Sequence, residues 1–173
     1  MDKTKLISAT IDCVDKKGVL PEINDLVQSA GVSKEVALDF KDSDEYDNIR
    51  AIRKKFTQKR KDGFKTFAKF YEWHSTQAQK CHYCETTQDE LNQLFGRELI
   101  ESKKFSESLH IERKDSSKGY SENNCVLASA LCNNAKSDMI SDENFKKYFG
   151  KQMREFITDL LSGKITNNIR VRE

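Results

Sequence analysis

The stretch that decides the fold runs from His110 to Lys136 and reads HIERKDSSKGYSENNCVLASALCNNAK. Residues 105–113, around its start, can form a strand, and residues 115–120 indicate a turn. Residues 124–127 can form a second strand, and a helix is expected from about Ala130. The stretch therefore predicts a strand, a turn, a second strand and a helix, in that order.

The cysteines form a second pattern. The chain has five of them, with Cys81 and Cys84 in a compact Cys-x2-Cys knuckle and Cys132 later in the chain. The sequence shows neither a signal-peptide core nor an apolar run of membrane length, so we expect a cytoplasmic protein and no membrane partner. Disulfides are uncommon in that compartment, and no thioredoxin-like pattern surrounds the knuckle, so metal binding is favoured over redox chemistry.

The two patterns together resemble a known family. From Cys81 to about Met139 the chain resembles HNH endonucleases of the zinc-bearing type, which carry Cys-x2-Cys, an acidic strand, Gly-Gly or Gly-Tyr, Asn, and Cys-x2-Cys-Asn-x2-Lys. Gly119-Tyr120 and Asn124 match the middle of this plan, and Cys132-Asn133-Asn134-Ala135-Lys136 matches its end. The resemblance implies a ββα-metal module, a hairpin followed by a helix that grips one divalent ion and hydrolyses DNA.

The resemblance also implies roles for single residues. Glu112 takes the place of the strand carboxylate and Asn133 that of the helix ligand, so both are expected to bind the catalytic ion. A hard, oxygen-rich site of this kind suits Mg²⁺ or Mn²⁺. Asn124 would brace the hairpin, and Lys136, one turn after Asn133, is expected to face the phosphate.

The general base departs from the family pattern. Many members have a His directly after the strand carboxylate, where this chain has Arg113, which stays protonated and can only clamp a phosphate. His110 is the nearest candidate, because strand alternation puts it on the same face as Glu112. The alternatives are that His110 only orients Glu112, or that the ion alone activates water. Asp115 is a further ligand or a turn residue.

The structural metal site is also incomplete. Cys81, Cys84 and Cys132 supply three thiolates, but Ser129 stands where the family has its remaining cysteine. Structural zinc nearly always has four ligands. The fourth candidates are Cys125, in the second strand, and His82. The alternative is a weakened or empty site whose cysteines pack as small apolar groups.

The N-terminal part has a different character. Residues 1–48 carry eleven Asp and Glu against six Lys and Arg, so the remainder is net positive and suits a polyanionic partner. Residues 4–17, a segment opened by Pro21 and one capped by Ser33 predict three helices. The plan resembles the helix-turn-helix unit of TetR-type regulators, although a helical bundle for packing or protein contacts is the favoured reading.

A basic segment follows this helical unit. Residues 44–72 predict one long helix, or two around Gly63, with four interleaved phenylalanines. The segment is either a solvated amphipathic helix or an extension of the DNA footprint. Its candidate DNA-binding residues are Arg50, Arg53, Lys54, Lys55, Lys59, Arg60 and Lys61.

The sequence therefore predicts an α+β, mostly helical protein. Residues 1–75 form a helical region, residues 76–162 an HNH module with a packing C-terminal helix that we expect over residues 142–161, and residues 163–173 a tail. The expected function is metal-dependent hydrolysis of DNA, by nicking or double-strand cleavage in restriction or defence, with structural Zn²⁺ and a homodimer as one option. The alternatives are a DNA-binding module with weak catalysis and a helix-turn-helix transcriptional regulator.

Overall fold

The computed structural model of the chain describes residues 3–58, 61–100 and 106–166. Over these residues the chain is mostly helical and contains one two-stranded antiparallel sheet, which agrees with the expected α+β class. The chain divides into two compact units, one of residues 1–76 with 120–122, the other of residues 77–119 with 123–173. Among the described residues, no helix has both the length and the apolar character needed to cross a membrane.

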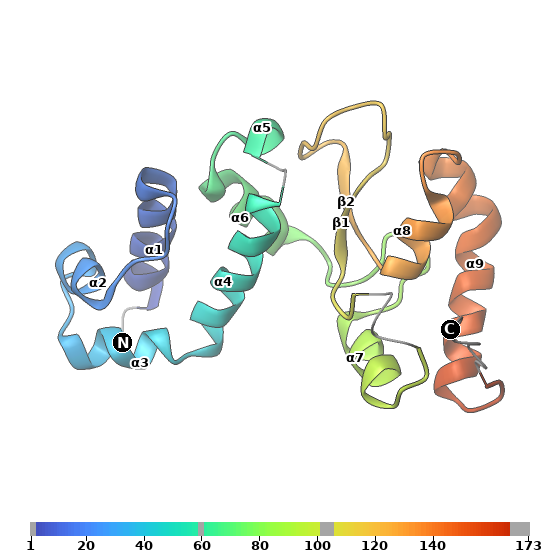
Figure 1. Cartoon of the computed structure of the whole chain (residues 1–173), viewed down its shortest axis with the longest axis horizontal. Coiled ribbons are helices and arrows are strands. Elements are labelled where there is room, and N and C mark those ends of the chain that lie inside the picture. Colours follow the sequence, from blue (N-terminus) through green and yellow to red (C-terminus); the bar gives the residue numbers. More distant parts are fainter. Residues whose placement is uncertain (1–2, 59–60, 101–105, 167–173) are drawn as a thin grey trace, which may run out of the picture. The chain divides into compact units, whose positions relative to one another are not determined.

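The first unit consists of helices (Figure 1). They are α1 (Lys3–Lys17), α2 (Ile23–Ala30), α3 (Lys34–Lys41), α4 (Asp44–Thr57), α5 (Lys61–Phe64) and α6 (Phe67–Thr76). The first three confirm the expected helices. The basic segment differs from expectation, because it is divided between α4, α5 and α6. Lys65, between α5 and α6, has a positive φ of 64°, a conformation that no helix interior accepts.

Local capping explains where several of these helices begin. The Ser33 side chain accepts a hydrogen bond from the Val36 amide, and the Ser43 side chain accepts one from the Tyr46 amide. Such side chains satisfy amide groups that have no partner inside the helix. Gly31 ends α2 with a left-handed φ of 66°, which glycine adopts without a steric penalty.

The core of the first unit is rich in aromatic rings. The ring of Phe70 lies 4.9 Å from that of Phe64, 5.4 Å from that of Phe56 and 5.7 Å from that of Trp73, measured between centroids. All four side chains are buried. The interleaved phenylalanines of the basic segment therefore face the interior, and burial of such rings is a main source of stability.

The second unit contains the hairpin. Its elements are α7 (Gln88–Gly96), β1 (His110–Arg113), β2 (Cys125–Ala128), α8 (Ala130–Lys136) and α9 (Asp142–Leu161). The two strands pair in antiparallel register, with His110 opposite Ala128 and Glu112 opposite Val126. The first strand is shorter than the predicted range of 105–113, and the expected first residue, 105, lies outside the described residues. The helices after residues 129 and 141 begin where expected.

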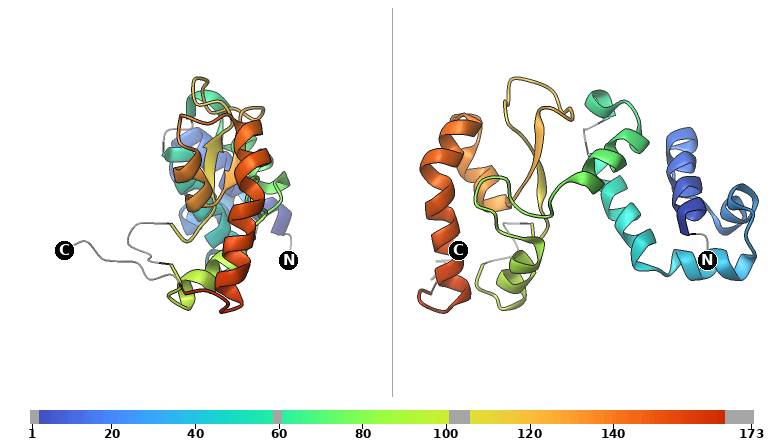
Figure 2. Two further views of the ribbon diagram at one scale, coloured as in Figure 1. Left: turned by 90° about the vertical axis from the view of Figure 1, so that its right-hand side faces the viewer. Right: turned by 180° about the vertical axis from the view of Figure 1, so that it is seen from behind.

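The C-terminal helix packs on the rest of the second unit, beside α8 (Figure 2). The ring of Phe145 lies 5.1 Å from that of Tyr83, edge to face. Gly150 allows close approach, since a Cβ atom there would lie 2.5 Å from the carbonyl oxygen of Tyr83. Helix α9 thereby holds the Cys81–Cys84 knuckle from one side.

Candidate functional site

Three cysteines meet inside the second unit. The Sγ atoms of Cys81, Cys84 and Cys132 all lie within 4.8 Å of one another, and all three residues are buried. The turn between the first two is closed by a hydrogen bond from the Glu85 amide to the Cys81 carbonyl, 2.9 Å long. Helix α8 contributes the third cysteine, Cys132. Soft thiolate donors in this arrangement could bind a metal such as zinc.

The candidates for a fourth zinc ligand lie elsewhere. Within the part of the chain that the structure describes, neither Cys125 nor His82 belongs to the cysteine group. Cys125 is at the start of β2, and the His82 Nε2 atom lies 3.4 Å from Asp142 Oδ1 on α9. Ser129 contacts the cysteine group directly. Its amide donates a hydrogen bond to the Cys81 thiol, and its hydroxyl accepts one from the Cys132 amide at 3.3 Å.

The three thiols influence one another electrostatically. Hydrogen bonds from Cys132 and then Cys84 lower the pKa of Cys81, and the bond to Cys81 raises the pKa of Cys132. Burial and like charge therefore prevent all three thiols from ionising together. A cation of the charge and softness of Zn²⁺ removes this penalty, so the donor set fits a structural metal.

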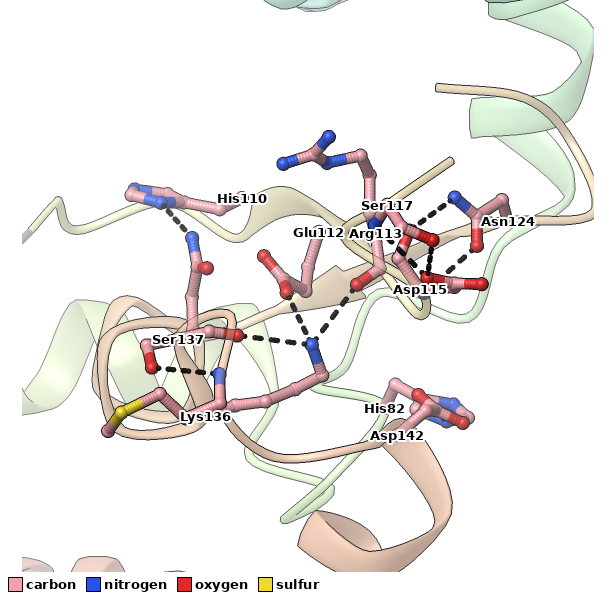
Figure 3. A network of polar contacts seen from close by, with 12 residues as sticks. His82, His110, Glu112, Arg113, Asp115, Ser117, Asn124, Lys136, Ser137 and Asp142 are labelled. Carbon is pink, nitrogen blue, oxygen red and sulfur yellow. Dashed lines mark hydrogen bonds and ion pairs between the residues drawn. The ribbon is translucent and has the colours of Figure 1, made fainter. Parts of the chain in front are cut away.

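The hairpin and α8 assemble a second group of side chains (Figure 3). His110 and Glu112 are two residues apart on β1 and therefore share a face of the strand. From α8, the Asn133 amide nitrogen lies 3.2 Å from Nδ1 of His110, and Lys136 Nζ donates to Glu112 Oε1 at 3.1 Å. The structure thus brings together four of the residues that the sequence singled out.

The surroundings of Glu112 act on its pKa in opposite directions. Burial raises the pKa of this carboxyl group, while the hydrogen bond from Lys136 opposes the increase. A carboxylate, an imidazole and an amide in one place can bind a hard divalent cation. The donor set therefore fits Mg²⁺ or Mn²⁺, with the condition that the ion shares Glu112 with the Lys136 ammonium.

Asn124 closes the loop between the strands. Its side-chain oxygen accepts from the Asp115 amide at 3.0 Å, and its nitrogen donates to the carbonyls of Asp115 and Gly119 at 3.0 and 2.9 Å. The Asp115 carboxylate accepts bonds from Ser117 and contacts Lys118. These bonds, that of the Ser117 hydroxyl above all, lower the pKa of Asp115 to about 2. Asp115 is thus engaged as a turn residue.

The two expected phosphate ligands differ in position. Lys136 is wholly buried, with 1% of its side chain exposed, so its ammonium does not face the solvent in this structure. The physical reason is that α8 ends at Lys136, whose side chain turns back beneath β1 to reach Glu112. Arg113 donates from Nη1 to the Lys118 carbonyl at 3.3 Å and remains partly exposed.

Sequence reasoning missed the neighbours that complete these groups. The Thr86 hydroxyl lies 3.1 Å from Cys84 Sγ and is fully buried. The Ser137 carbonyl accepts a bond from Lys136 Nζ at 3.4 Å. Single small polar residues beside a motif carry no periodic or spacing signal, so only the folded arrangement identifies them.

The basic residues of the first unit are unequally exposed. Arg50 forms an ion pair with Asp47 at 3.0 Å, with 59% of its side chain exposed, whereas Arg53 donates to the Gly18 carbonyl at 2.5 Å. Lys54 is exposed, and Lys55 is half-buried. Of the remaining candidates, Lys59 and Arg60 lie outside the described residues, as does the side chain of Lys61.

Comparison with known proteins gives limited information. No protein-family model matches the chain, and no curated protein matches it. Among solved structures, the chain is similar to PacI, described as a rare-cutting HNH restriction endonuclease, with 28% identity and a TM-score of 0.44. The match covers 53% of this chain and 63% of the PacI chain, which is less than two thirds of its length. A TM-score at this level does not establish a shared fold.

Proposed function

We propose that this protein is a metal-dependent endonuclease of the HNH type that hydrolyses phosphodiester bonds in DNA. The observation that carries the proposal is the grouping of His110, Glu112 and Asn133 on a hairpin and the helix that follows it. The order of Gly119-Tyr120, Asn124 and Cys132-Asn133 along the chain supports it independently.

The chemistry assigned to the site follows from its donors. A divalent ion, Mg²⁺ or Mn²⁺, would be held by Glu112 and Asn133 and would stabilise negative charge on the phosphate. His110 accepts a proton from the attacking water, since an imidazole titrates in the range where a base is useful. Asn133 fixes the plane of that imidazole through its contact with Nδ1, 3.2 Å away.

The cysteine group has a supporting role in this proposal. Cys81 and Cys84 in the knuckle and Cys132 on α8 would hold Zn²⁺. Because Asn133 directly follows Cys132, a bound zinc fixes the helix that presents Asn133 to His110. The proposed ligands of the divalent ion would then keep their geometry because a neighbouring rigid site holds the helix, and not because of flexible surface contacts.

DNA affinity in this proposal comes from basic surface residues. Arg50 and Lys54 are exposed on α4, and each neutralised phosphate releases counter-ions. Arg113, on the rim of the hairpin, is the residue proposed to contact the phosphate near the cut.

The test is cleavage of a supercoiled plasmid by the zinc-loaded full chain in Mg²⁺ or Mn²⁺. Glu112→Gln removes the carboxylate charge and is expected to reduce the rate at least about a hundredfold. His110→Ala is expected to reduce it by about 10² or more, the usual contribution of a general base. Supercoiled DNA that stays intact with the wild-type chain under both ions would refute the nuclease proposal.

Matched controls separate site effects from folding effects. Glu107→Gln makes the same chemical change at an exposed carboxylate in the same unit and is expected to leave the rate unchanged. A His110→Ala variant that cuts as fast as wild type would remove the base role from His110 and leave water activation to the ion.

A further inference from the structure

We propose that Lys136 is a positioning residue whose ammonium serves as a built-in counter-ion of Glu112. In this role it balances the carboxylate charge when no divalent ion is present, and it weakens the binding of that ion. The inference rests on the proposed function, in which Glu112 holds the divalent ion, and it replaces the expected contact between Lys136 and a phosphate.

The surroundings of the ammonium carry this inference. A lysine ammonium has three donor hydrogens and no acceptor. Lys136 Nζ has three acceptors, Glu112 Oε1 at 3.1 Å, the Arg113 carbonyl at 3.3 Å and the Ser137 carbonyl at 3.4 Å (Figure 3). Because 1% of its side chain is exposed, solvent cannot replace these partners. A charged lysine is rarely buried so deeply unless it is paired.

The backbone after Lys136 contributes to this arrangement. Ser137 is the C-cap of α8 and has φ 47° and ψ −148°, a combination that residues other than glycine rarely adopt. Its amide still bonds to the Asn133 carbonyl at 3.1 Å, and its carbonyl reaches the ammonium. An unfavourable backbone conformation persists only where surrounding contacts determine it. The contact to Lys136 is one of them.

The adjacent surface is poorly suited to a phosphate. Lys136 borders a cavity of about 610 Å³ that is also lined by the acidic residues Asp115, Asp138, Asp142 and Glu143. Lys114 and Lys118 line it as well and offset only part of this negative charge. A polyanion approaching Lys136 through the cavity would therefore meet repulsion, whereas a cation would not.

The counter-ion role predicts a specific effect of Lys136→Met on Mg²⁺ binding. If the ammonium competes for Glu112, its loss leaves a buried carboxylate that Mg²⁺ can neutralise alone. We expect the variant to bind Mg²⁺ at least about tenfold more tightly than wild type, which corresponds to about 1.4 kcal/mol. The measurement is the shift of melting temperature of the zinc-loaded full chain as Mg²⁺ is added in chelator-free buffer.

Two further variants make the test decisive. Lys118→Met removes an exposed lysine near the same cavity, with 72% of its side chain exposed, and should leave Mg²⁺ affinity unchanged. The double variant Glu112→Gln/Lys136→Met removes both charges and should recover most of the melting temperature that Lys136→Met loses. If the double variant is as unstable as Lys136→Met, or if the latter binds Mg²⁺ no more tightly than wild type, the counter-ion role is wrong.

DNA binding in the absence of Mg²⁺ provides an independent readout. A lysine that contacts a phosphate contributes about one unit to the slope of log affinity against log salt concentration. The counter-ion role predicts that Lys136→Met leaves this slope unchanged, and a slope reduced by about one unit would restore the phosphate contact. If Lys136→Met binds Mg²⁺ more tightly as expected but the wild-type chain does not cleave the plasmid, the nuclease proposal is wrong and the counter-ion role is not affected. The two outcomes can be told apart because neither the melting temperature nor the salt slope depends on cleavage.

Discussion

The two units are stabilised in different ways. In the first, the rings of Phe56, Phe64, Phe67, Phe70 and Trp73 fill the interior. In the second, apolar residues such as Leu94 and Phe145 share the interior with Cys81, Thr86 and Lys136, all of which are at most 1% exposed. An aromatic core is stabilised by burial itself, whereas buried polar groups require a partner for each atom.

This difference indicates where the chemistry lies. Polar and charged groups inside a protein are costly unless they are hydrogen-bonded or bind a metal, so their concentration in the second unit needs an explanation. The cysteine group, which could bind a metal, and the ion pair between Glu112 and Lys136 supply one. In the first unit, the basic residues Arg50 and Lys54 are instead exposed on α4.

The largest expected effect comes from removing a ligand of the proposed structural zinc. Cys84→Ser removes one of three thiolates, and structural zinc contributes about 10–16 kcal/mol to the folding of small zinc-finger peptides at neutral pH. We expect amide hydrogen exchange in α7, α8 and the hairpin of the full chain to accelerate to nearly the unprotected rate. Exchange in α4 and α6 should stay slow, because their core contains no metal ligand among the described residues.

Cys13→Ala is the matched control for this prediction. Cys13 is buried in the first unit and does not belong to the cysteine group. It should leave zinc content and exchange in the second unit as in wild type. Unchanged protection of the hairpin in Cys84→Ser would mean that the cysteines are merely packed against one another and that the contrast between the units is absent.

An intermediate effect is expected from pH on the first unit. His74 is 4% exposed, and in the described part of the chain its Nε2 atom has no hydrogen-bond partner. Burial, and next the charge of Lys55, lower the pKa of this histidine from 6.5 to about 4. The folded state therefore keeps it neutral while the unfolded state gains a proton as the pH falls below 6.5.

The sign follows from the lowered pKa. The stability associated with neutral His74 is complete above pH 6.5 and is lost as the pH falls toward 4. The free energy of unfolding then decreases by at most about 1.4 kcal/mol per pH unit. Urea unfolding followed by fluorescence of Trp73, the single tryptophan, reports on this unit. His74→Phe retains a ring beside Phe70 and should remove this part of the pH dependence. An equally steep loss in the variant would exclude His74 as its source.

Local signals made most of the helices predictable. Ser33 caps the helix that begins one residue later, because its short polar side chain accepts a hydrogen bond from the amide three positions on, a relation contained in a few residues. The apolar spacing of residues 142–161 likewise gave the whole of α9. By contrast, the interruption of the helix near Lys65 depends on a positive φ at this residue, which its residue type does not predict.

Part of the grouping of the candidate residues followed from the sequence, but the contacts between them did not. Strand alternation placed His110 beside Glu112, since it needs only the period of a strand. The direction of Lys136 depends on where α8 ends relative to β1, which is a tertiary property. The same applies to Cys125, whose distance from the cysteine group follows from its place in the hairpin register.

The smallest expected effect concerns a polar contact at the edge of the second unit. Arg154 on α9 donates to both carboxylate oxygens of Glu90 on α7, at 2.7 and 2.6 Å, and its bonds are the largest cause of the lowering of the Glu90 pKa to about 2. The stability contributed by the pair of Arg154 and ionised Glu90 is complete above pH 4.5 and is lost as the pH falls toward 2. With 38% of the Arg154 side chain exposed, solvent screening limits it.

We therefore expect Arg154→Met to lower the unfolding free energy of the second unit at pH 7 by only about 1 kcal/mol. Faster exchange of the α7 and α9 amides in urea would measure it, and 1 M salt should reduce the difference. Lys164→Met is the control, because Lys164 is 67% exposed and pairs with Asp159 at a single 2.9 Å contact. If both variants lower the unfolding free energy equally, the bidentate geometry adds nothing at the contact between α7 and α9. The polar stabilisation of the second unit then comes from its buried groups alone.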